Sequence, residues 1–437
     1  MRRWVLALLV VLAVLAGGVA VALHLNESGP VAAPLPTPEP VPSRTPLLSA
    51  ETTTAAPTEA GLRRALAAAL ADKALGGRVS IAVVDGTGRT LLDIAGTRAV
   101  TPASTPKIAT AAAALAVLPS DLRLRTRVVA GAHPGEVVLV GGGDPSLGGR
   151  LATSGFPSTA RLVTLARSLT GVTRVLVDDT LYAGPRLGPG WKPSYVTTGN
   201  AAPVSALEVD EGRTAKTGPR VQDPALEAGR QLAALLKVKA PVARTTAPAA
   251  AQELAHVDSA PLPELVEAML TRSDNDLAEA LGRQIALAAK QPASFDGAAA
   301  ATRAALASLV KGGTALRDSS GLSPLNRVQP LAVAQLLAAT AKDARFAPLL
   351  SGLPVGGFDG TLAKRYRKAP TSSAAGEVRA KTGTLNGVSA LAGFVTTRTG
   401  GVLAFDVTAD GVPLGGTLAA EAALDRVAAA LAACGCT

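Results

Sequence analysis

The sequence predicts an α+β fold, in which an antiparallel sheet flanked by helices is interrupted by a mainly β insertion. Apolar residues alternate in a hairpin pattern over 78–96 and in further strands near the C-terminus, and long helices fill 261–342. Short strands separated by Gly- and Pro-rich loops fill 121–256. Strands on either side of the helical block can form one sheet with the helices packed against it. We therefore assign 61–120 and 257–437 to one domain and 121–256 to the inserted domain or domains.

The first 60 residues predict export and a spacer. Arg2 and Arg3 precede an uninterrupted apolar run over 4–23, which is long enough to span a bilayer. We interpret 1–26 as a membrane anchor, with a cleaved signal peptide as the alternative, because its small-x-small site is weak. Proline recurs through 27–60, which predicts an extended, semi-rigid linker. The rest of the chain is then extracytoplasmic: membrane-anchored, or secreted if the segment is cleaved.

Composition argues against nucleic-acid binding and metal chemistry. The chain carries 43 Lys and Arg against 33 Asp and Glu, a net charge of +10, but its basic residues never form a run of five or more. Aromatic residues make up only 3%, so we expect no nucleic-acid partner. The three histidines show no ligand spacing, so we expect no metal and no cofactor. Cys434 and Cys436 can bridge to each other or pair with another molecule.

A serine nucleophile is predicted where a helix follows the first hairpin. Ser104 and Lys107 are three residues apart, so their side chains share one face of that helix. A lysine can take the proton of a serine when burial or a neighbouring cation lowers its pKa. The helix N-terminus also favours the negative charge that develops during attack. An alternative is that Ser104 only caps the helix.

The same spacing recurs at Ser308 and Lys311, and the local sequence separates the two pairs. Gly312-Gly313 follows the second pair, which predicts a helix C-terminus. There the helix dipole opposes an oxyanion, so the pair that opens at Ser104 is preferred.

The K-T-G triplet also occurs twice, at 216–218 and at 381–383. Pro219 follows the first triplet and has no backbone N–H, whereas Thr384 follows the second within a predicted strand. An acyl-transfer enzyme needs two backbone donors at the developing oxyanion. Ser104 and Thr384 can supply them, and Pro219 cannot.

One S-x-N triplet, at 273–275, completes the set. It can also be interpreted as the cap of the next helix, and Lys381 as a charge that protects a strand edge. Three such coincidences in the required order favour a single site, because S-x-x-K, a second serine triplet and K-T-G act together in one class of enzymes. The candidate residues are Ser104, Lys107, Ser273, Asn275 and Lys381, with Thr382, Gly383 and Thr384 beside them.

The three motifs resemble those of the penicillin-binding protein and serine β-lactamase superfamily. The details look most like the low-molecular-mass class C penicillin-binding proteins, the D-alanyl-D-alanine carboxypeptidase/endopeptidase family. The resemblance runs from about Gly61 to Gly435 and includes "APVSALEVDEG" (202–212), "LTRSDNDLAEAL" (270–281) and "DSSGLSPLNRV" (318–328). It implies a β-lactamase/transpeptidase-like catalytic domain, with the family's extra domains inserted between the first and second motifs.

The resemblance implies a serine DD-peptidase that acts on peptidoglycan stem peptides. Ser104 would attack the carbonyl of the penultimate D-alanine, Lys107 would accept its proton, and water would release the acyl-enzyme. Ser273, beside Lys381, would relay a proton to the leaving D-alanine. β-Lactams would acylate Ser104 and act as inhibitors. The membrane would be a further partner through the N-terminal helix, and the catalytic domain would face the cell wall.

The resemblance also implies how the substrate is held. Asn275 would hold the substrate amide, and Lys381 and Thr382 would bind the terminal carboxylate. The N–H groups of Ser104 and Thr384 would hold the oxyanion.

Three alternatives stay open. A class A β-lactamase would need a glutamate in an E-x-x-L-N loop, and neither Leu-Asn pair of this chain, at 325–326 or 385–386, has one. Slow deacylation of penicillin is therefore expected. The motifs do not separate carboxypeptidase, endopeptidase and transpeptidase activities. A catalytically inert, tethered wall-binding protein is the remote alternative, against which the intact Ser104, Lys107 and Lys381 argue.

Overall fold

The computed structural model describes residues 57–151 and 161–436. The predicted anchor at 1–26 and most of the predicted linker lie outside these ranges. Within the two ranges, no helix is both long and apolar enough to cross a membrane.

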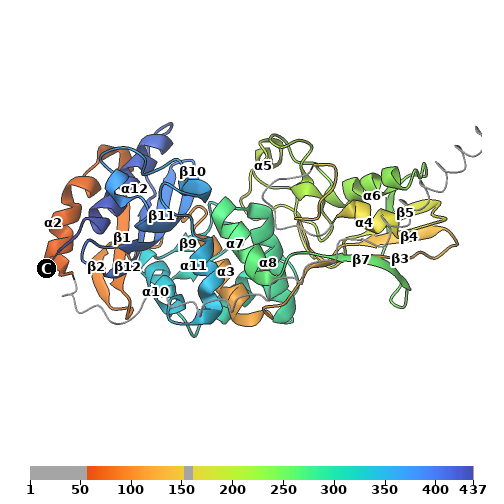
Figure 1. The fold of residues 1–437 in the computed structure, drawn as a ribbon, viewed down its shortest axis with the longest axis horizontal. Helices are drawn as coiled ribbons and strands as arrows, with labels where there is room; N and C mark the ends of the chain where they lie inside the picture. The colour runs from red at the N-terminus through yellow and green to blue at the C-terminus, as the bar shows by residue number, and fades with distance from the viewer. Residues whose placement is uncertain (1–56, 152–160, 437) are drawn as a thin grey trace, which may run out of the picture. The chain divides into compact units, whose positions relative to one another are not determined.

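One five-stranded antiparallel sheet is built from both ends of the chain, as the sequence predicts. Its order is β10-β11-β12-β1-β2 (Figure 1). The strands are β1 (Val79–Asp85), β2 (Thr90–Ile94), β10 (Val378–Leu385), β11 (Val388–Thr396) and β12 (Val402–Ala409). We predicted two strands after the helical block, and that number was wrong. A turn in which Thr397 N–H donates to Gly401 O at 2.8 Å divides the last predicted strand into β11 and β12.

Helices cover both faces of this sheet (Figure 1). On one side lie α2 (Glu59–Leu70) and α12 (Thr417–Ala432). On the other side lie α3 (Pro106–Val117), α7 (Leu262–Arg272), α8 (Asn275–Ala288), α9 (Phe295–Leu306), α10 (Pro330–Thr340) and α11 (Ala347–Gly352). Alternate residues of each strand enter the two cores, since successive side chains of a strand point to opposite faces. Val83 thus packs with α12, and Val84 packs with the larger group of helices.

The alanine-rich sequence after Ser104 forms the central helix, α3. Ala111, Ala112, Ala113 and Ala114 are fully buried, and α8 and α9 pack against this helix. A helix that is apolar on all sides is a buried helix, and small side chains let its neighbours approach closely. The nucleophile candidate is therefore carried by a rigid core element.

The segment at 121–256 contributes a second sheet, of order β6-β5-β4-β3-β7. Its strands are β3 (Arg125–Ala130), β4 (Glu136–Val140), β5 (Arg174–Asp178), β6 (Ala243–Arg244) and β7 (Glu253–Asp258). The pairs β4-β5 and β5-β6 are parallel, and α4 (Leu162–Arg167) and α6 (Pro224–Leu235) pack against the sheet. The segment is therefore mixed helix and sheet, and the domain boundaries at 120 and 257 stay a prediction.

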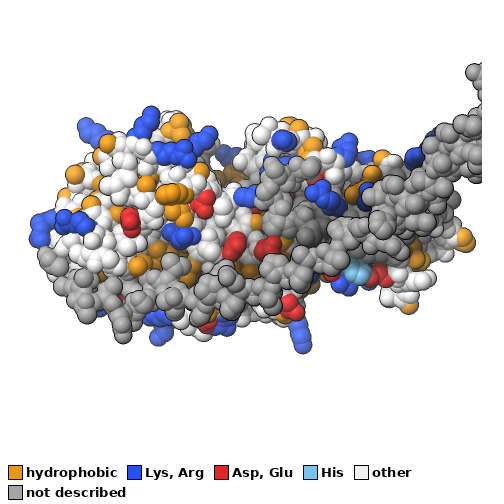
Figure 2. All heavy atoms as spheres, viewed as in Figure 1, with side chains coloured by type: hydrophobic (Ala, Val, Ile, Leu, Met, Phe, Trp, Pro, Cys, Tyr) orange, Lys and Arg blue, Asp and Glu red, His pale blue; other side chains and the backbone are white. Residues whose placement is uncertain are grey.

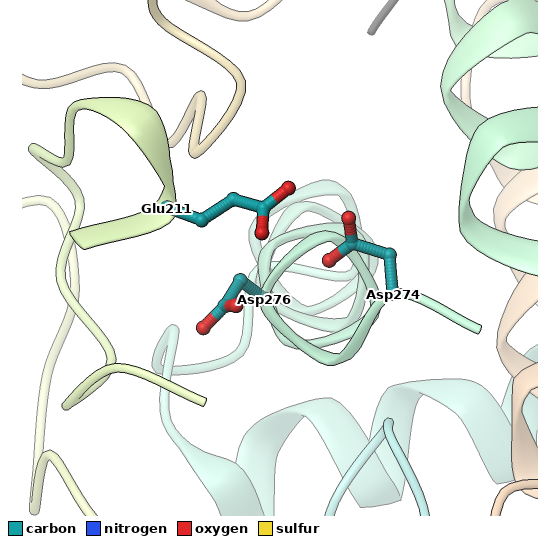
Figure 3. A group of neighbouring side chains, drawn as sticks. All are labelled: Glu211, Asp274 and Asp276. Carbon is teal, nitrogen blue, oxygen red and sulfur yellow. The ribbon is translucent and has the colours of Figure 1, made fainter. Parts of the chain in front are cut away.

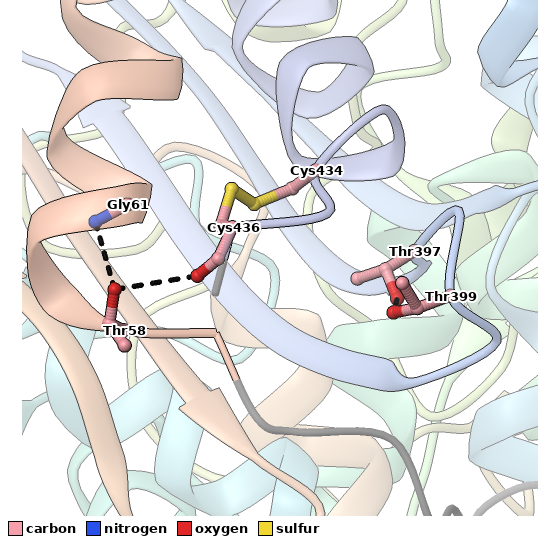
Figure 4. The surroundings of a disulfide bond; sticks show 6 residues. All are labelled: Thr58, Gly61, Thr397, Thr399, Cys434 and Cys436. Atoms are coloured by element: carbon pink, nitrogen blue, oxygen red, sulfur yellow. Dashed lines mark hydrogen bonds between the residues drawn. A yellow bond between two sulfur atoms is a disulfide. The ribbon is translucent and has the colours of Figure 1, made fainter.

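Cys434 and Cys436 form a disulfide at the end of the described chain, and this end lies against the beginning of α2 (Figure 4). Thr58 N–H donates to Cys436 O at 2.8 Å, and the Thr58 hydroxyl caps α2 by accepting from Gly61 N at 3.1 Å. Gly61 is required there, because a Cβ at this position would lie 2.6 Å from Cys436 O. On the face that Figure 2 shows, Lys and Arg side chains are scattered among apolar and uncharged groups.

A buried carboxyl group lies in the same row of the sheet as Lys381. Lys381 pairs with Ala392 and Ala392 pairs with Asp406. Asp406 is fully buried, and Thr408 Oγ1 donates to its Oδ1 at 2.8 Å. Burial raises the pKa of Asp406 to about 7, although the bond from Thr408 opposes this shift.

Asp406→Asn should therefore stabilise the protein more at pH 8 than at pH 5. The pKa of about 7 in the folded state lies above the ordinary value of 3.8, so stability falls as the pH rises between these two values. The full difference corresponds to about 4 kcal/mol, so we expect the substitution to add about 2–4 kcal/mol to the free energy of unfolding at pH 8. Less than half of this gain is expected at pH 5. Urea unfolding at both pH values measures the effect, and an equal effect at both would contradict it.

Candidate active site

Ser104 lies in the turn that immediately precedes α3. The helix begins at Pro106, and Thr105 is its N-cap residue. Ser104 is therefore not the helix cap, and its hydroxyl is available for another role. Ala103 just before it adopts a left-handed backbone with φ of 50°, which a non-glycine residue adopts only under constraint from its surroundings.

The side chain of Lys107 joins three separate segments of the chain. Its Nζ donates to Ser104 Oγ at 3.2 Å, to Asn275 Oδ1 at 2.7 Å and to Ser320 O at 2.6 Å. The residue is completely buried. Burial lowers the pKa of Lys107 to about 8, and the attraction of nearby carboxylates, Asp318 foremost, limits this shift. A substantial fraction of neutral amine is thus present near neutral pH.

The S-x-N triplet occupies the junction between α7 and α8. Ser273 adopts a left-handed conformation with φ of 56° where α7 ends, and Asp274 caps α8 by accepting from Leu277 N at 3.0 Å. The capping role therefore belongs to Asp274. Asn275 opens α8, with its Nδ2 donating to Asn200 O at 2.8 Å.

Lys381 on β10 contacts the S-x-N triplet. Although β10 is an edge strand, Lys381 is fully buried, so it does not act as a solvent-exposed edge charge. Its Nζ donates to Ser273 Oγ and to Thr382 O, both at 2.8 Å. Burial lowers the pKa of Lys381 well below its ordinary value, and the positive charge of Lys107 adds to this effect.

A cleft of about 320 Å³ opens over these groups. It is lined by Ser104, Tyr195, Asn200, Ser273, Asn275, Leu322, Thr361, Arg365, Thr382, Thr384, Leu385 and Glu421. A second cleft, of about 790 Å³, shares Tyr195, Asn200, Thr384 and Leu385 with it. Gly383 allows β10 to approach the nucleophile turn, because a Cβ there would lie 2.8 Å from Pro102 O. The structure thus brings all the predicted site residues into one region.

The two duplicate motifs lie apart from this site. Ser308 and Lys311 follow the end of α9 at Leu306 and are exposed. The helix predicted over 296–311 ends five residues earlier than expected, so this pair is not on a helix. The triplet at 216–218 lies in an exposed loop.

Three supporting residues, Glu279, Asp318 and Tyr195, were not singled out from the sequence. Glu279 Oε1 accepts from Ser319 N at 3.0 Å and from Ser320 N at 2.9 Å, which orients the carbonyl that Lys107 binds. Asp318 accepts from Trp191 Nε1 at 2.7 Å and from Gly321 N at 2.8 Å. Tyr195 lines both clefts. The sequence analysis noted the stretch 318–328 only for its resemblance to the family, because its residue types alone indicate no function.

One group of carboxylates in the described ranges has the spacing of metal ligands. Oxygen atoms of Glu211, Asp274 and Asp276 lie within 4.8 Å of one another (Figure 3). Arg213, Arg220 and Arg272 pair with members of the group. These guanidiniums supply positive charge where a cation would otherwise be needed.

Comparison with known proteins places the chain in a family. The profile of the D-Ala-D-Ala carboxypeptidase 3 (S13) family matches residues 62–219 and 213–431. The chain is 39% identical over 429 residues to carboxypeptidase Rv3627c of Mycobacterium tuberculosis, covering 93% of this chain and 91% of that protein. It is 40% identical over 402 residues to carboxypeptidase DacB of Mycolicibacterium smegmatis, covering 87% and 85%.

A solved structure confirms the expected fold. Penicillin-binding protein 4 (dacB) from Haemophilus influenzae matches with a TM-score of 0.70 at 23% identity, covering 84% of this chain and 97% of that one. At 23% identity, this match supports an assignment of the fold alone.

Gly321→Ala should disable the nucleophile turn. Gly321 has φ of +85°, and a Cβ there would lie 1.8 Å from Ala103 O, whereas Gly312 has φ of +67° and nothing within 4 Å. Both alanine variants share the backbone strain, so their difference isolates the clash beside Ser104. We expect acylation by penicillin to slow about 100-fold in Gly321→Ala and to change less than about twofold in Gly312→Ala. Equal acylation rates in the two variants would refute this.

The rate of acylation should rise with pH through about 8, the pKa of Lys107. Only the neutral amine can take the proton of Ser104, so the rate increases as the ammonium form is lost and levels off above that pH. Second-order rate constants with penicillin between pH 6 and 9.5 measure this profile. A rate that is flat or falls across that range would show that Lys107 is not the base.

Proposed function

Because the chain belongs to the D-Ala-D-Ala carboxypeptidase 3 (S13) family, we propose that its carboxypeptidase activity proceeds through an acyl-enzyme on Ser104. Members of this family act on peptidoglycan peptides and bind β-lactams. The predicted enzyme class, a serine-type D-Ala-D-Ala carboxypeptidase, is confirmed. The observation that carries the assignment to Ser104 is the buried Lys107 amine, which contacts both Ser104 Oγ and Asn275 Oδ1.

Acylation begins when neutral Lys107 takes the proton of the Ser104 hydroxyl. Ser104 Oγ bonds to the carbonyl carbon of the penultimate D-alanine, and the N–H groups of Ser104 and Thr384 hold the oxyanion. Ser273, hydrogen-bonded to Lys381, delivers a proton to the leaving nitrogen. The C–N bond then breaks and D-alanine departs. The proton that Lys107 took from Ser104 replaces the one that Ser273 gave up. Water then gives a proton to the neutral Lys107 while its oxygen attacks the ester carbonyl. The ester C–O bond breaks, Ser104 Oγ takes the proton from Lys107, and the shortened peptide leaves with a new carboxyl group.

Substrate binding uses the groups around the cleft. The Lys381 amine and the Thr382 hydroxyl bind the terminal carboxylate. Gly383 lets this strand lie close to the nucleophile turn. Thr361 extends this hydroxyl pair, because Thr382 Oγ1 donates to Thr361 Oγ1 at 2.9 Å. Asn275 holds the amide of the stem peptide. Its own orientation is set by Lys107 on one side and Asn200 O on the other.

Endopeptidase activity is part of the proposal. Cleavage of a cross-link breaks the same kind of D-alanyl amide bond, with a larger leaving amine. The 790 Å³ cleft beside the catalytic one offers room for a longer peptide. Water is proposed as the acyl acceptor; an amine acceptor would make the enzyme a transpeptidase.

The membrane is also proposed as a partner, through the apolar run at 4–23. Its length and the preceding arginines support an anchor with the catalytic domain on the wall side. When the full chain is expressed, recovery of the protein in the soluble fraction without its N-terminal apolar run would favour a cleaved signal instead.

Ser104→Ala should abolish covalent labelling by fluorescent penicillin and release of D-alanine from a pentapeptide. Ser308→Ala is the matched control, because it removes the serine of the duplicate motif and should keep both activities. Muropeptide dimers added to the same assay report endopeptidase activity. Absence of labelling in the unmutated protein would refute the acyl-enzyme proposal. Undiminished labelling of Ser104→Ala would show that another residue is the nucleophile.

A further inference from the structure

Part of the catalytic cleft is supplied by the inserted segment. The loop at 195–202 places Tyr195 and Asn200 in the cleft wall. Asn200 O accepts from Asn275 Nδ2 at 2.8 Å. The orientation of the Asn275 amide therefore depends on where this loop lies.

Arg220 forms hydrogen bonds to the backbone of this loop. It follows Pro219, the residue that excludes the first K-T-G from the active site, and its guanidinium is buried. Its backbone N–H donates to Val196 O at 2.9 Å and its Nε donates to Gly199 O at 3.1 Å. Two bonds from one residue thus fix the middle of the loop.

The same guanidinium reaches α8, next to Asn275. Arg220 Nη2 lies 3.0 Å from Asp276 Oδ2, and Asp276 Oδ1 accepts from Ala202 N at 2.9 Å. Asp276 is itself buried. Arg220 and Asp276 together therefore connect the loop to the first turn of the helix that carries Asn275.

Glu211 belongs to the same cluster of buried charges as Arg220 and Asp276, and its backbone is constrained. Arg220 Nη1 lies 3.3 Å from Glu211 Oε2, and Arg272 Nη2 donates to Glu211 Oε1 at 3.0 Å. Asp210 and Glu211 both have left-handed φ, at 53° and 54°. Such conformations are unfavourable for non-glycine residues and persist only where surrounding contacts hold them. The arginine contacts and the strained turn indicate a cluster that is fixed in place.

The cluster is neutralised by arginines, which distinguishes it from a cation site. Burial raises the pKa of both Glu211 and Asp276, and the guanidiniums of Arg213 and Arg220 oppose this rise. Removing Arg220 leaves a buried, uncompensated charge on Asp276, so the surrounding groups must move. Glu211, in contrast, keeps Arg220 and Arg272 when Arg213 is removed.

We propose that Arg220 is a positioning residue for acyl transfer, which fixes the loop at 195–202 against α8 and thereby orients the Asn275 amide toward the substrate amide. This inference rests on the proposed function of Ser104 and Asn275. It assigns a role in substrate recognition to a residue that lies outside all three catalytic motifs.

Two penicillins separate positioning from folding. Benzylpenicillin carries a side-chain amide for Asn275 to bind, and 6-aminopenicillanic acid lacks that amide but can still acylate Ser104. In Arg220→Gln we expect acylation by benzylpenicillin to slow about 10–100-fold and acylation by 6-aminopenicillanic acid to slow less than about threefold. Arg213→Gln is the matched control, because it removes another partner of Glu211 without touching the loop, and both rates should stay within about twofold.

A second variant tests the same proposal if Arg220→Gln does not fold. Asp276→Asn keeps an oxygen for Ala202 N–H and loses the charge opposite Arg220, so the same selective loss is expected. Equal losses with both penicillins, or no loss with either, would overturn the inference in whichever variant folds. Failure of the unmutated protein to react with either penicillin would instead refute the proposed function.

Added calcium chloride tests the cation alternative. We expect the melting temperature of the unmutated protein to stay unchanged. A saturable rise that Glu211→Gln removes would overturn the arginine-neutralised interpretation.

Discussion

The site depends on the complete burial of two amines. Lys107 and Lys381 are both without solvent exposure, and each is held by oxygen atoms from distant parts of the chain. An ammonium group buried in this way is strongly destabilised unless polar groups surround it or it gives up its proton. The fold must therefore bring α3, the α7-α8 junction, the 318–321 loop and β10 to one point. The same burial makes the lysines useful, because it weakens their hold on a proton.

The elements that meet at this point are held by ordinary packing. Small alanines on α3 allow close contact with α8 and α9, and glycines allow the loops to approach the nucleophile turn. Ala103 and Ser273 both adopt left-handed backbones next to reacting groups. Local strain of this kind is stable only because the surrounding helices and sheet are rigid.

The sequence predicted those candidate site residues whose signals were local. Ser104, in the turn before α3, is only three residues from Lys107 in the first turn of that helix. Pro219 excluded the first K-T-G triplet by its missing N–H. The β11-β12 turn was missed because apolar residues alternate on both sides of it. Arg220, Glu279 and Asp318 were missed for another reason: their partners lie far away in sequence, and single charged residues have no distinctive pattern. The contribution of the loop at 195–202 to the cleft depends on tertiary contacts and has no local signal.

The insertion is therefore not an interchangeable module. Residues 195–202 form part of the cleft wall, and Arg220 and Trp191 fasten the segment to α8 and to the 318–321 loop. A chimaera that took 121–256 from a relative would therefore also exchange the part of the cleft wall that Tyr195 and Asn200 form. Deletion of the segment would remove the ion pair between Arg220 and Asp276 and the hydrogen bond that Trp191 donates to Asp318. A substitution in this segment therefore alters the surroundings of Asn275 and Asp318 as well as the segment itself.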